Sequence, residues 1–288
     1  GKLFTSACSS TIHRYLQESA CQFKQQTNMI TFSVVTITYN AADVLKPTLD
    51  SVLRQSFPTI EHIIVDGAST DNTLAIANAY KELSDSAENG HIVRIKSEPD
   101  KGLYDAMNKG LARANGDYVV FLNAGDRFPT ADTIEKVALA AEVGDGEKRP
   151  VVVYGDTDII DEKGNFLYHR RLQPPEKLTW RSFRDGMLVC NQDFYARLDI
   201  AKKIPFNTHF RYSADIDWCI KIMREGEKEG LLLRNVHAVL ANYLEEGQTT
   251  KHHRASLYDR FRVMCKHYGV FPTIAKHAWF VVRLFTKK

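Results

Sequence analysis

The feature that most constrains the fold is a regular alternation of short apolar runs and amphipathic helical segments in the first half of the chain. Each apolar run is rich in Val and Ile, and a polar turn follows it. The four runs are FSVVTIT, EHIIVD, HIVRIKS and YVVFL, at residues 32–38, 61–66, 91–97 and 118–122. Continuous apolar strands separated by helical periods predict βαβ units and a parallel sheet that is buried on both faces.

The pattern changes in the second half of the chain. Residues 151–170 predict a strand and a hairpin that turns at residues 163–165, where the sequence is KGN. Helical periods return at residues 213–225 and again from His252 onward. We therefore expect an α/β fold with a mostly parallel, Rossmann-like sheet flanked by helices, a smaller antiparallel portion and C-terminal helices.

The 288 residues are enough for one large domain with short appendages. We expect residues 1–28 to be an N-terminal extension and residues 29–250 to form the domain. Its two halves, 29–128 and 129–250, would supply the two sides of one site. Residues 251–288 form a basic, helical tail.

Charge and cysteine content narrow the class of protein. The formal net charge of +3 is ordinary for a soluble protein. Five widely spaced cysteines without a CxxC pair predict neither a disulfide framework nor a zinc site, which favours a reducing, cytoplasmic compartment. No apolar run approaches the roughly 20 residues of a membrane-spanning helix.

The fourth apolar run ends in FLNAGD, so small and polar residues follow a buried strand. Parallel sheets bind ligands just beyond the carboxyl ends of their strands. Asn123, Ala124 and Gly125 would let a ligand approach the backbone closely, and Asp126 offers it a formal charge. A carboxylate at this point indicates a bound cation; a turn capped by Asp126 is the open alternative.

Three other strands should end at the same edge of the sheet. Thr38 and Tyr39 finish the first strand, and Asp66 closes the second. Asp100 and Lys101 follow the third strand. Such side chains predict a pocket with acceptors for a base or ribose, a carboxylate for a metal and a cation for phosphate. The alternative is that these loops are merely polar, as surface loops usually are.

Four longer runs resemble, in order, the motifs of the family 2 glycosyltransferases. They are VVTITYNAADVLKPTLDSVLRQSF, EHIIVDGASTDNT, EPDKGLYDAMNKGLARANGDYVVFLNAGD and YSADIDWCIKIMREG, and they lie between about residues 32 and 225. Several ordered motifs are more specific than any single short motif. The resemblance implies a GT-A fold, a nucleotide-sugar donor, a divalent cation and an inverting transfer to a hydroxyl group.

The resemblance also implies roles for individual residues on the donor side. Thr38 and Tyr39 would line the nucleotide pocket, Asp66 would read the uracil edge, and Asp100 would contact the nucleoside. For Ser69, helix capping is an equally open role. The implied donor-binding residues are Thr38, Tyr39, Asp66, Ser69, Asp100, Lys101, Asn108, Lys109, Asn123, Ala124 and Gly125.

The FLNAGD run occupies the position of the family's metal motif but departs from it. The earlier acids of the DxD pattern are replaced by Asn123 and Gly125, so Asp126 would hold Mg²⁺ or Mn²⁺ alone among the side chains. Diphosphate oxygens and water would complete the octahedral shell. We expect such a site to bind metal weakly without the donor.

A second acidic group lies in YSADIDW, where Asp215 aligns with the acid of the family's ED motif and Ala214 replaces its Glu. The implied role of Asp215 is general base, taking the proton from the attacking acceptor hydroxyl. Asp215 and Asp217 are two residues apart, so only one of them can face a pocket from a helix. The alternative is that both simply favour the N-terminus of a helix.

The run GMLVCNQDFY resembles the family's acceptor-side segment, in which Asn191 and Gln192 would bind sugar hydroxyls. Satisfying loop backbone groups is the open alternative for both amides. The region after NYLEEGQTTKHHR has no QxxRW motif, which processive members carry. This absence favours single addition over polymerisation.

The tail from Lys251 onward carries nine Lys and Arg residues against one acid and also contains Phe, Trp, Val and Leu. A basic amphipathic segment can lie on the inner face of an anionic membrane, which would suit a lipid-linked acceptor. An ordinary terminal helix packed on the domain is the alternative. We expect no nucleic-acid partner, because no recognised binding module is present.

On these grounds we expect an inverting glycosyltransferase that moves a sugar, from a UDP-sugar, to a hydroxyl of a saccharide or lipid-linked acceptor in polysaccharide or glycolipid assembly. A catalytically inactive nucleotide-sugar binding module is the alternative, favoured by the thinned metal motif. A sugar nucleotidyltransferase or a dinucleotide oxidoreductase would need a glycine-rich loop after the first strand, which TYNAADVLK does not supply.

Overall fold

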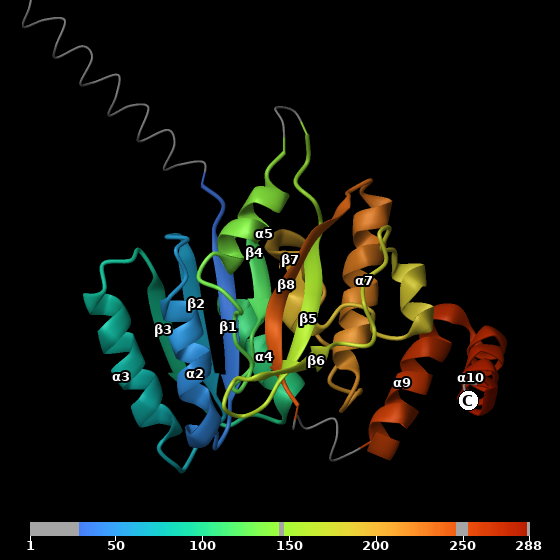
Figure 1. Cartoon of the computed structure of the whole chain (residues 1–288), viewed down its shortest axis with the longest axis horizontal. Helices are drawn as coiled ribbons and strands as arrows, with labels where there is room; N and C mark the ends of the chain where they lie inside the picture. Colours follow the sequence, from blue (N-terminus) through green and yellow to red (C-terminus); the bar gives the residue numbers. More distant parts are fainter. Residues whose placement is uncertain (1–28, 144–146, 246–252, 287–288) are drawn as a thin grey trace, which may run out of the picture.

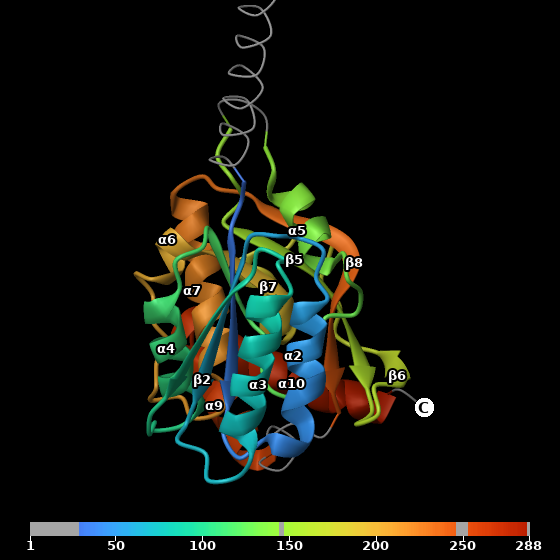
Figure 2. The same ribbon diagram turned by 90° about the vertical axis from the view of Figure 1, so that its left-hand side faces the viewer.

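The computed structural model describes residues 29–143, 147–245 and 253–286, so the predicted extension at residues 1–28 lies outside the described residues. The described strands form one eight-stranded sheet in the order β3-β2-β1-β4-β7-β5-β6, with β8 paired to β5. Helices cover both of its faces (Figures 1 and 2). The predicted α/β fold is confirmed, and the sheet is mixed, with four parallel and three antiparallel pairings among the described strands.

The first four strands are parallel, as the alternating pattern predicts. They are β1 (Phe32–Thr38), β2 (Ile60–Asp66), β3 (Ile92–Ser97) and β4 (Tyr118–Phe121). All residues of β1, β2 and β4 are buried, because helices cover both sides of these strands. The third strand lies at the edge of the sheet and has exposed positions.

Helices cover both faces of this parallel half. The helices are α2 (Ala42–Leu53), α3 (Thr73–Ser86), α4 (Leu103–Arg113) and α5 (Thr133–Ala141). Of these, α2, α3 and α5 lie on one face and α4 lies on the other. Ile64 packs with Leu49 of α2, whereas its neighbour Val65 packs with Met107 of α4. Because successive strand residues point to opposite faces, α2 and α4 lie on opposite sides of the sheet.

The second half of the chain adds the antiparallel part. Its strands are β5 (Val152–Ile160), β6 (Phe166–His169), β7 (Phe194–Arg197) and β8 (Leu233–Leu244). The hairpin predicted within residues 151–170 is confirmed as the antiparallel pair β5–β6. We did not predict α5, β7 or β8, because β7 has four residues and β8 lacks a clear alternation of buried and exposed positions.

The predicted helices of the C-terminal part are present. They are α7 (Ala214–Lys228), α9 (His253–Tyr268) and α10 (Val270–Thr286), and shorter turns form η1 (Trp180–Asp185), η2 (Asn191–Asp193) and α6 (Leu198–Ala201). Tyr268 of α9 stacks on Trp180 of η1, with ring centroids 5.6 Å apart. In Figure 1, α9 and α10 lie at the side of the molecule away from α3. Within the described part of the chain, no helix has the length and apolar character needed to cross a bilayer.

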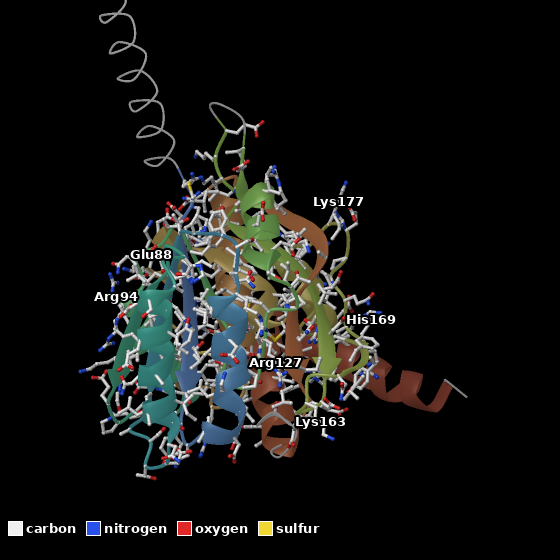
Figure 3. All side chains as sticks on the ribbon, turned by 60° about the vertical axis from the view of Figure 1, so that its left-hand side comes forward. Glu88, Arg94, Arg127, Lys163, His169 and Lys177 are labelled. Atoms are coloured by element: carbon white, nitrogen blue, oxygen red, sulfur yellow. The ribbon has the colours of Figure 1, made fainter. Side chains whose placement is uncertain are left out.

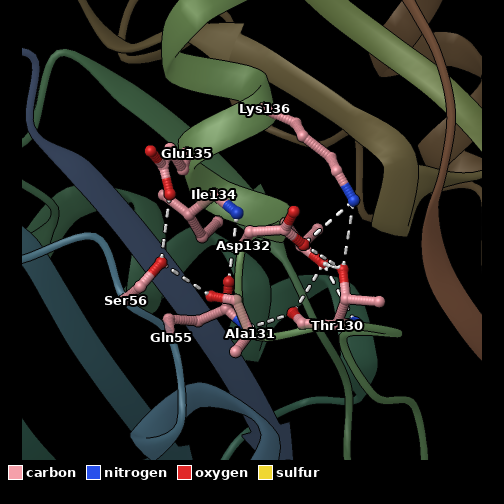
Figure 4. A network of polar contacts seen from close by, with 9 residues as sticks. Gln55, Ser56, Thr130, Ala131, Asp132, Ile134, Glu135 and Lys136 are labelled. Carbon is pink, nitrogen blue, oxygen red and sulfur yellow. Dashed lines mark hydrogen bonds and ion pairs between the residues drawn. The ribbon is translucent and has the colours of Figure 1, made fainter.

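A row of polar side chains on α2 supports the segment that follows β4. Thr48 and Ser51 are buried and accept hydrogen bonds from the backbone N–H groups of Gly125 (2.9 Å) and Phe128 (3.1 Å). Gln55 extends the row by donating to the Thr130 carbonyl at 2.8 Å and accepting from the N–H of Ile134 at 3.0 Å. Figure 4 shows this last part of the network. Thr48 and Ser51 are three positions apart on one face of α2, and Gln55 follows two residues after the end of the helix.

Candidate active site

The predicted meeting of four strand ends at one edge of the sheet is confirmed. Thr38 is in register with Asp66, and Asp66 is in register with Ser97. The N–H of Gly67 donates to the Thr38 carbonyl at 2.9 Å, and the N–H of Leu122 donates to the Val35 carbonyl at 2.9 Å. The polar residues that follow the four strands therefore share one rim.

Tyr39 and Asp100 lie on either side of Gly67 at this rim. A Cβ atom on Gly67 would lie 2.5 Å from Oδ2 of Asp100 and 3.2 Å from Cδ2 of Tyr39, so a larger residue would collide with both. The Tyr39 ring is 63% exposed, which leaves an aromatic face open to a planar base. The Asp100 carboxylate accepts the N–H of Gly102 at 2.7 Å, which fixes the loop before α4.

Asp66 and Ser69 form a closed network in the turn after β2. Asp66 is fully buried and accepts hydrogen bonds from the Ser69 N–H (3.0 Å), the Ser69 hydroxyl and the Ser97 hydroxyl (2.6 Å). The Ser69 hydroxyl in turn accepts the N–H of Asn40 at 2.8 Å. The buried Thr38 hydroxyl has no hydrogen-bond partner among the described residues. Direct contact of these residues with a donor stays a prediction.

Asn108 and Lys109 of α4 contact other loops of the protein. The Asn108 side chain donates to the Phe206 carbonyl (3.0 Å) and accepts the Phe206 N–H (2.8 Å). Lys109 donates to the Pro99 carbonyl at 2.6 Å, next to Asp100. Lys101 is exposed, and its N–H is bound by Asp105 at 3.0 Å. In the described structure Asn108 joins the two halves of the domain, and a donor contact by it stays a prediction.

The predicted metal residue Asp126 is 4% exposed and lies between two elements of the second half. Its Oδ2 accepts from Nε2 of Gln192 at 2.7 Å, and its Oδ1 accepts from the N–H of Leu244 at 3.1 Å. The structure thus brings the predicted metal residue into contact with a predicted acceptor-side residue. Burial raises the pKa of Asp126 to about 7, although both hydrogen bonds oppose the rise.

The residues of this loop fit a divalent cation that shares its ligands with the donor. Oδ1 of Asn123 is buried and has no hydrogen-bond partner among the described residues. This oxygen could therefore bind a cation or accept a hydrogen bond from a ligand. A cation would also restore the ionised form of Asp126. The described residues contain no group of three His, Cys, Asp or Glu side chains able to hold a metal. A cation bound here would therefore need further ligands from outside the protein, such as diphosphate oxygens and water.

Polar side chains of η2 lie near Asp126, and several of their buried polar atoms have no hydrogen-bond partner among the described residues. Both polar atoms of the Asn191 amide are buried and have no partner among the described residues. Asp193, which we did not predict, is fully buried, and its Oδ2 accepts the Thr157 hydroxyl while its Oδ1 has no hydrogen bond. Burial raises the pKa of Asp193 well above its ordinary value. This cluster gives the site polar groups that a sugar hydroxyl could satisfy.

Asp215 and Asp217 lie in the first turn of α7 and point to different surroundings, as predicted. The Tyr104 hydroxyl donates to Oδ1 of Asp215 at 3.1 Å, and burial raises the pKa of Asp215. Asp217 is buried against α9, where it binds Lys266 at 2.9 Å and His267 at 2.8 Å. Burial alone would raise the pKa of Asp217, but its partners outweigh burial and hold the pKa below the ordinary range.

Arg260 of α9, which we did not predict as a site residue, interacts electrostatically with Asp215 of α7. Its positive charge lowers the pKa of Asp215, and burial lowers its own pKa. Nε of Arg260 is buried and has no hydrogen-bond partner among the described residues. Arg170, at the end of the β5–β6 hairpin, interacts electrostatically with both Arg260 and Asp193. A series of charged groups thus connects Asp126, through Asp193 and these two arginines, to Asp215.

A hollow of about 290 Å³ lies next to Gly125 of the FLNAGD loop. Its walls come from the start of α2, from Gly125 and Arg127, and from Leu244 at the end of β8. Arg127 donates to the carbonyl of Glu162 at 2.8 Å in the hairpin turn, beside Lys163 (Figure 3). Apart from Gly125, none of the predicted site residues lines this hollow, so we do not assign it to the donor.

Comparison with known proteins decides the family. A family model described as glycosyl transferase family 2 matches residues 33–204, which is more than half of the chain. The chain belongs to this family. It is a glycosyltransferase, and the resemblance inferred from its motifs is confirmed.

Similar members of family 2 come from bacteria. A PGL/p-HBAD biosynthesis glycosyltransferase of Mycobacterium bovis is 35% identical over 217 residues, which cover 75% of this chain and 77% of the relative. The putative teichuronic acid biosynthesis glycosyltransferase TuaG of Bacillus subtilis is 43% identical over 104 residues, which cover 36% of this chain and 39% of the relative.

Solved structures show the same fold. S. aureus TarS 1-349 in complex with UDP-GlcNAc superimposes with a TM-score of 0.63 at 20% identity, and the match covers 82% of this chain and 64% of TarS. The mannosyltransferase PcManGT of Pyrobaculum calidifontis, in complex with GDP-Man and Mn²⁺, has a TM-score of 0.57 at 17% identity and covers 89% and 76% of the two chains. The GT-A fold expected from the motifs is thereby confirmed.

Proposed function

We propose that the protein transfers a sugar, with inversion, from a UDP-sugar to a hydroxyl group of a saccharide or lipid-linked acceptor in glycolipid or polysaccharide assembly. One observation carries the proposal. Asp100, which flanks the open face at Tyr39 and Gly67, lies just before α4, and Tyr104 in the first turn of α4 contacts Asp215. The residues proposed to hold the nucleobase and the residue proposed as general base are thus linked through the N-terminus of α4, which supports the proposal.

In this proposal Asp215 is the general base. As the acceptor oxygen attacks the anomeric carbon, Asp215 takes the hydroxyl proton, and the bond to the nucleoside diphosphate breaks on the opposite side. The carboxylate must be ionised to accept that proton. Because burial raises the pKa of Asp215, we expect transfer to fall on the acid side at a higher pH than an exposed Asp would give.

Asp126 and Asn123 would hold a Mg²⁺ or Mn²⁺ ion together with the donor diphosphate. When bound, the ion would offset the negative charge that develops on the leaving diphosphate. Structural neighbours of the same fold bind Mn²⁺ together with GDP-Man or UDP, and TarS binds UDP-GlcNAc, which supports this assignment. The lipid-linked class of acceptor is supported by the similarity to the mycobacterial PGL/p-HBAD enzyme.

A calorimetric titration with UDP, GDP and dTDP, each with and without Mn²⁺, tests the donor site without an acceptor. We expect UDP to bind most tightly and Mn²⁺ to strengthen its binding by at least about tenfold, equivalent to 1.4 kcal/mol. Preferred binding of GDP would overturn the choice of base. If none of the three nucleotides bound under any condition, the proposal of a donor pocket would fail.

A catalytically inactive binding module is the second candidate, because Asp126 is the one acid left in the metal motif. The two functions differ in turnover. The purified protein should release UDP from at least one UDP-sugar when acceptor lipid extracts are added, and a coupled assay for UDP measures this. Binding of UDP-sugars without any release of UDP would favour the module.

The C-terminal helices present apolar side chains that suit a membrane-bound acceptor. Val270, Phe271 and Ile274 of α10 are 53%, 87% and 50% exposed, and Leu257 and Tyr258 of α9 are also exposed. The tail that contains them is strongly basic. We propose that this surface lies on an anionic bilayer, because apolar side chains beside Lys and Arg favour such an interface.

A vesicle experiment tests this surface. The full chain should sediment with vesicles that contain anionic phosphatidylglycerol, and salt should weaken the binding. The double variant Phe271→Ser/Ile274→Ser should bind at least about fivefold more weakly, because it removes two exposed apolar side chains. Leu139→Ser is a matched control, because Leu139 is 62% exposed on α5. Equal binding by the double variant and the control would contradict the assignment.

A further inference from the structure

Tyr104 joins the donor side of the protein to its general base. It lies in the first turn of α4, is 6% exposed, and its hydroxyl donates to Oδ1 of Asp215 at 3.1 Å. The N–H of Ile216 donates to the same oxygen at 2.9 Å. Both of these hydrogen bonds end on Oδ1, and neither involves Oδ2.

An aromatic stack holds the Tyr104 ring in place. Tyr104 stacks on Phe206 with centroids 5.8 Å apart, and Phe206 stacks on Trp218 of α7 with centroids 4.7 Å apart. Asn108 fixes Phe206 through both backbone groups, at 2.8 and 3.0 Å. Because α4 supplies Tyr104 and Asn108 while α7 supplies Trp218 and Asp215, the stack fixes the two helices relative to each other.

The hydroxyl can act on Asp215 only as a donor. Burial and the negative charge of Asp215 raise the pKa of Tyr104 well above its ordinary value, so the phenol stays protonated at neutral pH. A hydrogen bond to the ionised carboxylate stabilises that form and so lowers the pKa of Asp215. The other titratable groups that act on Asp215 are Arg260 of α9 and Cys219, one turn along α7.

We propose that Tyr104 is the positioning residue of the general base. Its hydroxyl holds Oδ1 of the ionised Asp215 carboxylate, so that Oδ2 faces the acceptor hydroxyl. The inference rests on the role proposed for Asp215 above. It also gives Asn108 a part in the site, because Asn108 fixes Phe206, which stacks on the Tyr104 ring.

The variant Tyr104→Phe tests the proposal, because it removes the hydroxyl and keeps the stacked ring. Loss of a hydrogen bond to a charged carboxylate corresponds to a rise of about one unit in its pKa. The acid limb of the kcat profile should therefore move up by about one pH unit, so that lost activity returns as the pH rises. The KM for the donor should change by less than about twofold, because the hydroxyl contacts the base and not the nucleotide.

Tyr118→Phe is the matched control. Tyr118 is also buried, and its hydroxyl donates to the Pro150 carbonyl at 2.6 Å at the start of β4, far along the sheet from its carboxyl edge. This variant loses one buried tyrosine hydroxyl without touching Asp215, so its acid limb should coincide with that of the unchanged protein. A shift of equal size in both variants would overturn the proposal, since general loosening of the fold would then explain it.

A titration that needs no substrate separates this inference from the proposed function. The ¹³Cγ resonance of Asp215, assigned by its absence in Asp215→Asn, reports the ionisation of that carboxyl directly. Its midpoint should rise by about one pH unit in Tyr104→Phe and stay unchanged in Tyr118→Phe. An unchanged midpoint in Tyr104→Phe would overturn the inference. A shifted midpoint in a protein that transfers no sugar would support the action of Tyr104 on Asp215 and count against the proposed function alone.

Discussion

Replacing Asp215 by Asn is expected to lower the rate of sugar transfer by about 1000-fold while UDP affinity changes by no more than a few fold. A general base contributes roughly 100- to 10,000-fold, and an amide cannot accept the proton. Asn keeps an oxygen for the Tyr104 hydroxyl and the Ile216 N–H, so α7 should retain its position. Steady-state transfer assays and calorimetry with UDP and Mn²⁺ measure the two effects separately.

Asp199→Asn provides the control for this substitution. Asp199 is an exposed acid on α6 that binds Arg197 at 2.7 Å, and no predicted site residue contacts it among the described interactions. Its amide variant should retain transfer within about twofold, as surface substitutions usually do. If Asp215→Asn lost UDP binding as completely as it lost transfer, the role of base would be wrong and Asp215 would belong to the donor pocket.

Replacing Asp126 is expected to have the second large effect, on binding. Asp126→Asn keeps the shape of the side chain and an acceptor for the N–H of Leu244, but it removes the charge that would hold the cation. We expect the strengthening of UDP binding by Mn²⁺ to disappear and transfer to fall by at least about 100-fold. Calorimetry with and without Mn²⁺ measures the first effect and the transfer assay measures the second.

Asp126→Ala separates the loss of charge from the loss of packing. It also removes the acceptor for the N–H of Leu244, which Asn keeps, so thermal unfolding should show a lower midpoint than for Asp126→Asn. If both variants bind UDP equally and neither responds to Mn²⁺, the charge is the decisive property. Retained strengthening by Mn²⁺ in Asp126→Asn would show that another residue holds the metal.

The parallel half of the fold could be predicted from the sequence because its signals are local. Continuous apolar runs formed the buried strands, and the helical segments expected between them formed α2, α3 and α4. The long strand β8 was missed because its residues are mostly half-buried and polar ones such as Arg234 and Asn242 interrupt its apolar pattern. Its partner β5 supplies the hydrogen bonds, and no local pattern in β8 reveals that pairing.

The site was predictable only in part for the same reason. Motifs pointed to Asp126 and Asp215 as candidate site residues, because Asp126 ends the FLNAGD run after a strand and Asp215 lies at the beginning of a helix. The contacts that define their surroundings join residues 66 and 111 positions apart, namely Gln192 with Asp126 and Tyr104 with Asp215. Arg260 lies in a tail whose cations were considered for contact with an anionic membrane and not for a contact with Asp215. A single sequence carries no signal for such distant pairs.

The row of polar side chains on α2 restricts how the FLNAGD loop can respond to a ligand. Thr48, Ser51 and Gln55 bind backbone groups at successive points from Gly125 to Ile134, so this segment has little freedom to shift without breaking buried hydrogen bonds. We therefore expect the segment from Gly125 to Ile134 to stay in place when a ligand binds. Adjustment to different sugars would come from the other segments that surround the site. A deletion of one residue in α2 between Thr48 and Ser51 would turn Ser51 by about 100° around the helix axis relative to Thr48, so the two hydroxyls could no longer bind this segment together.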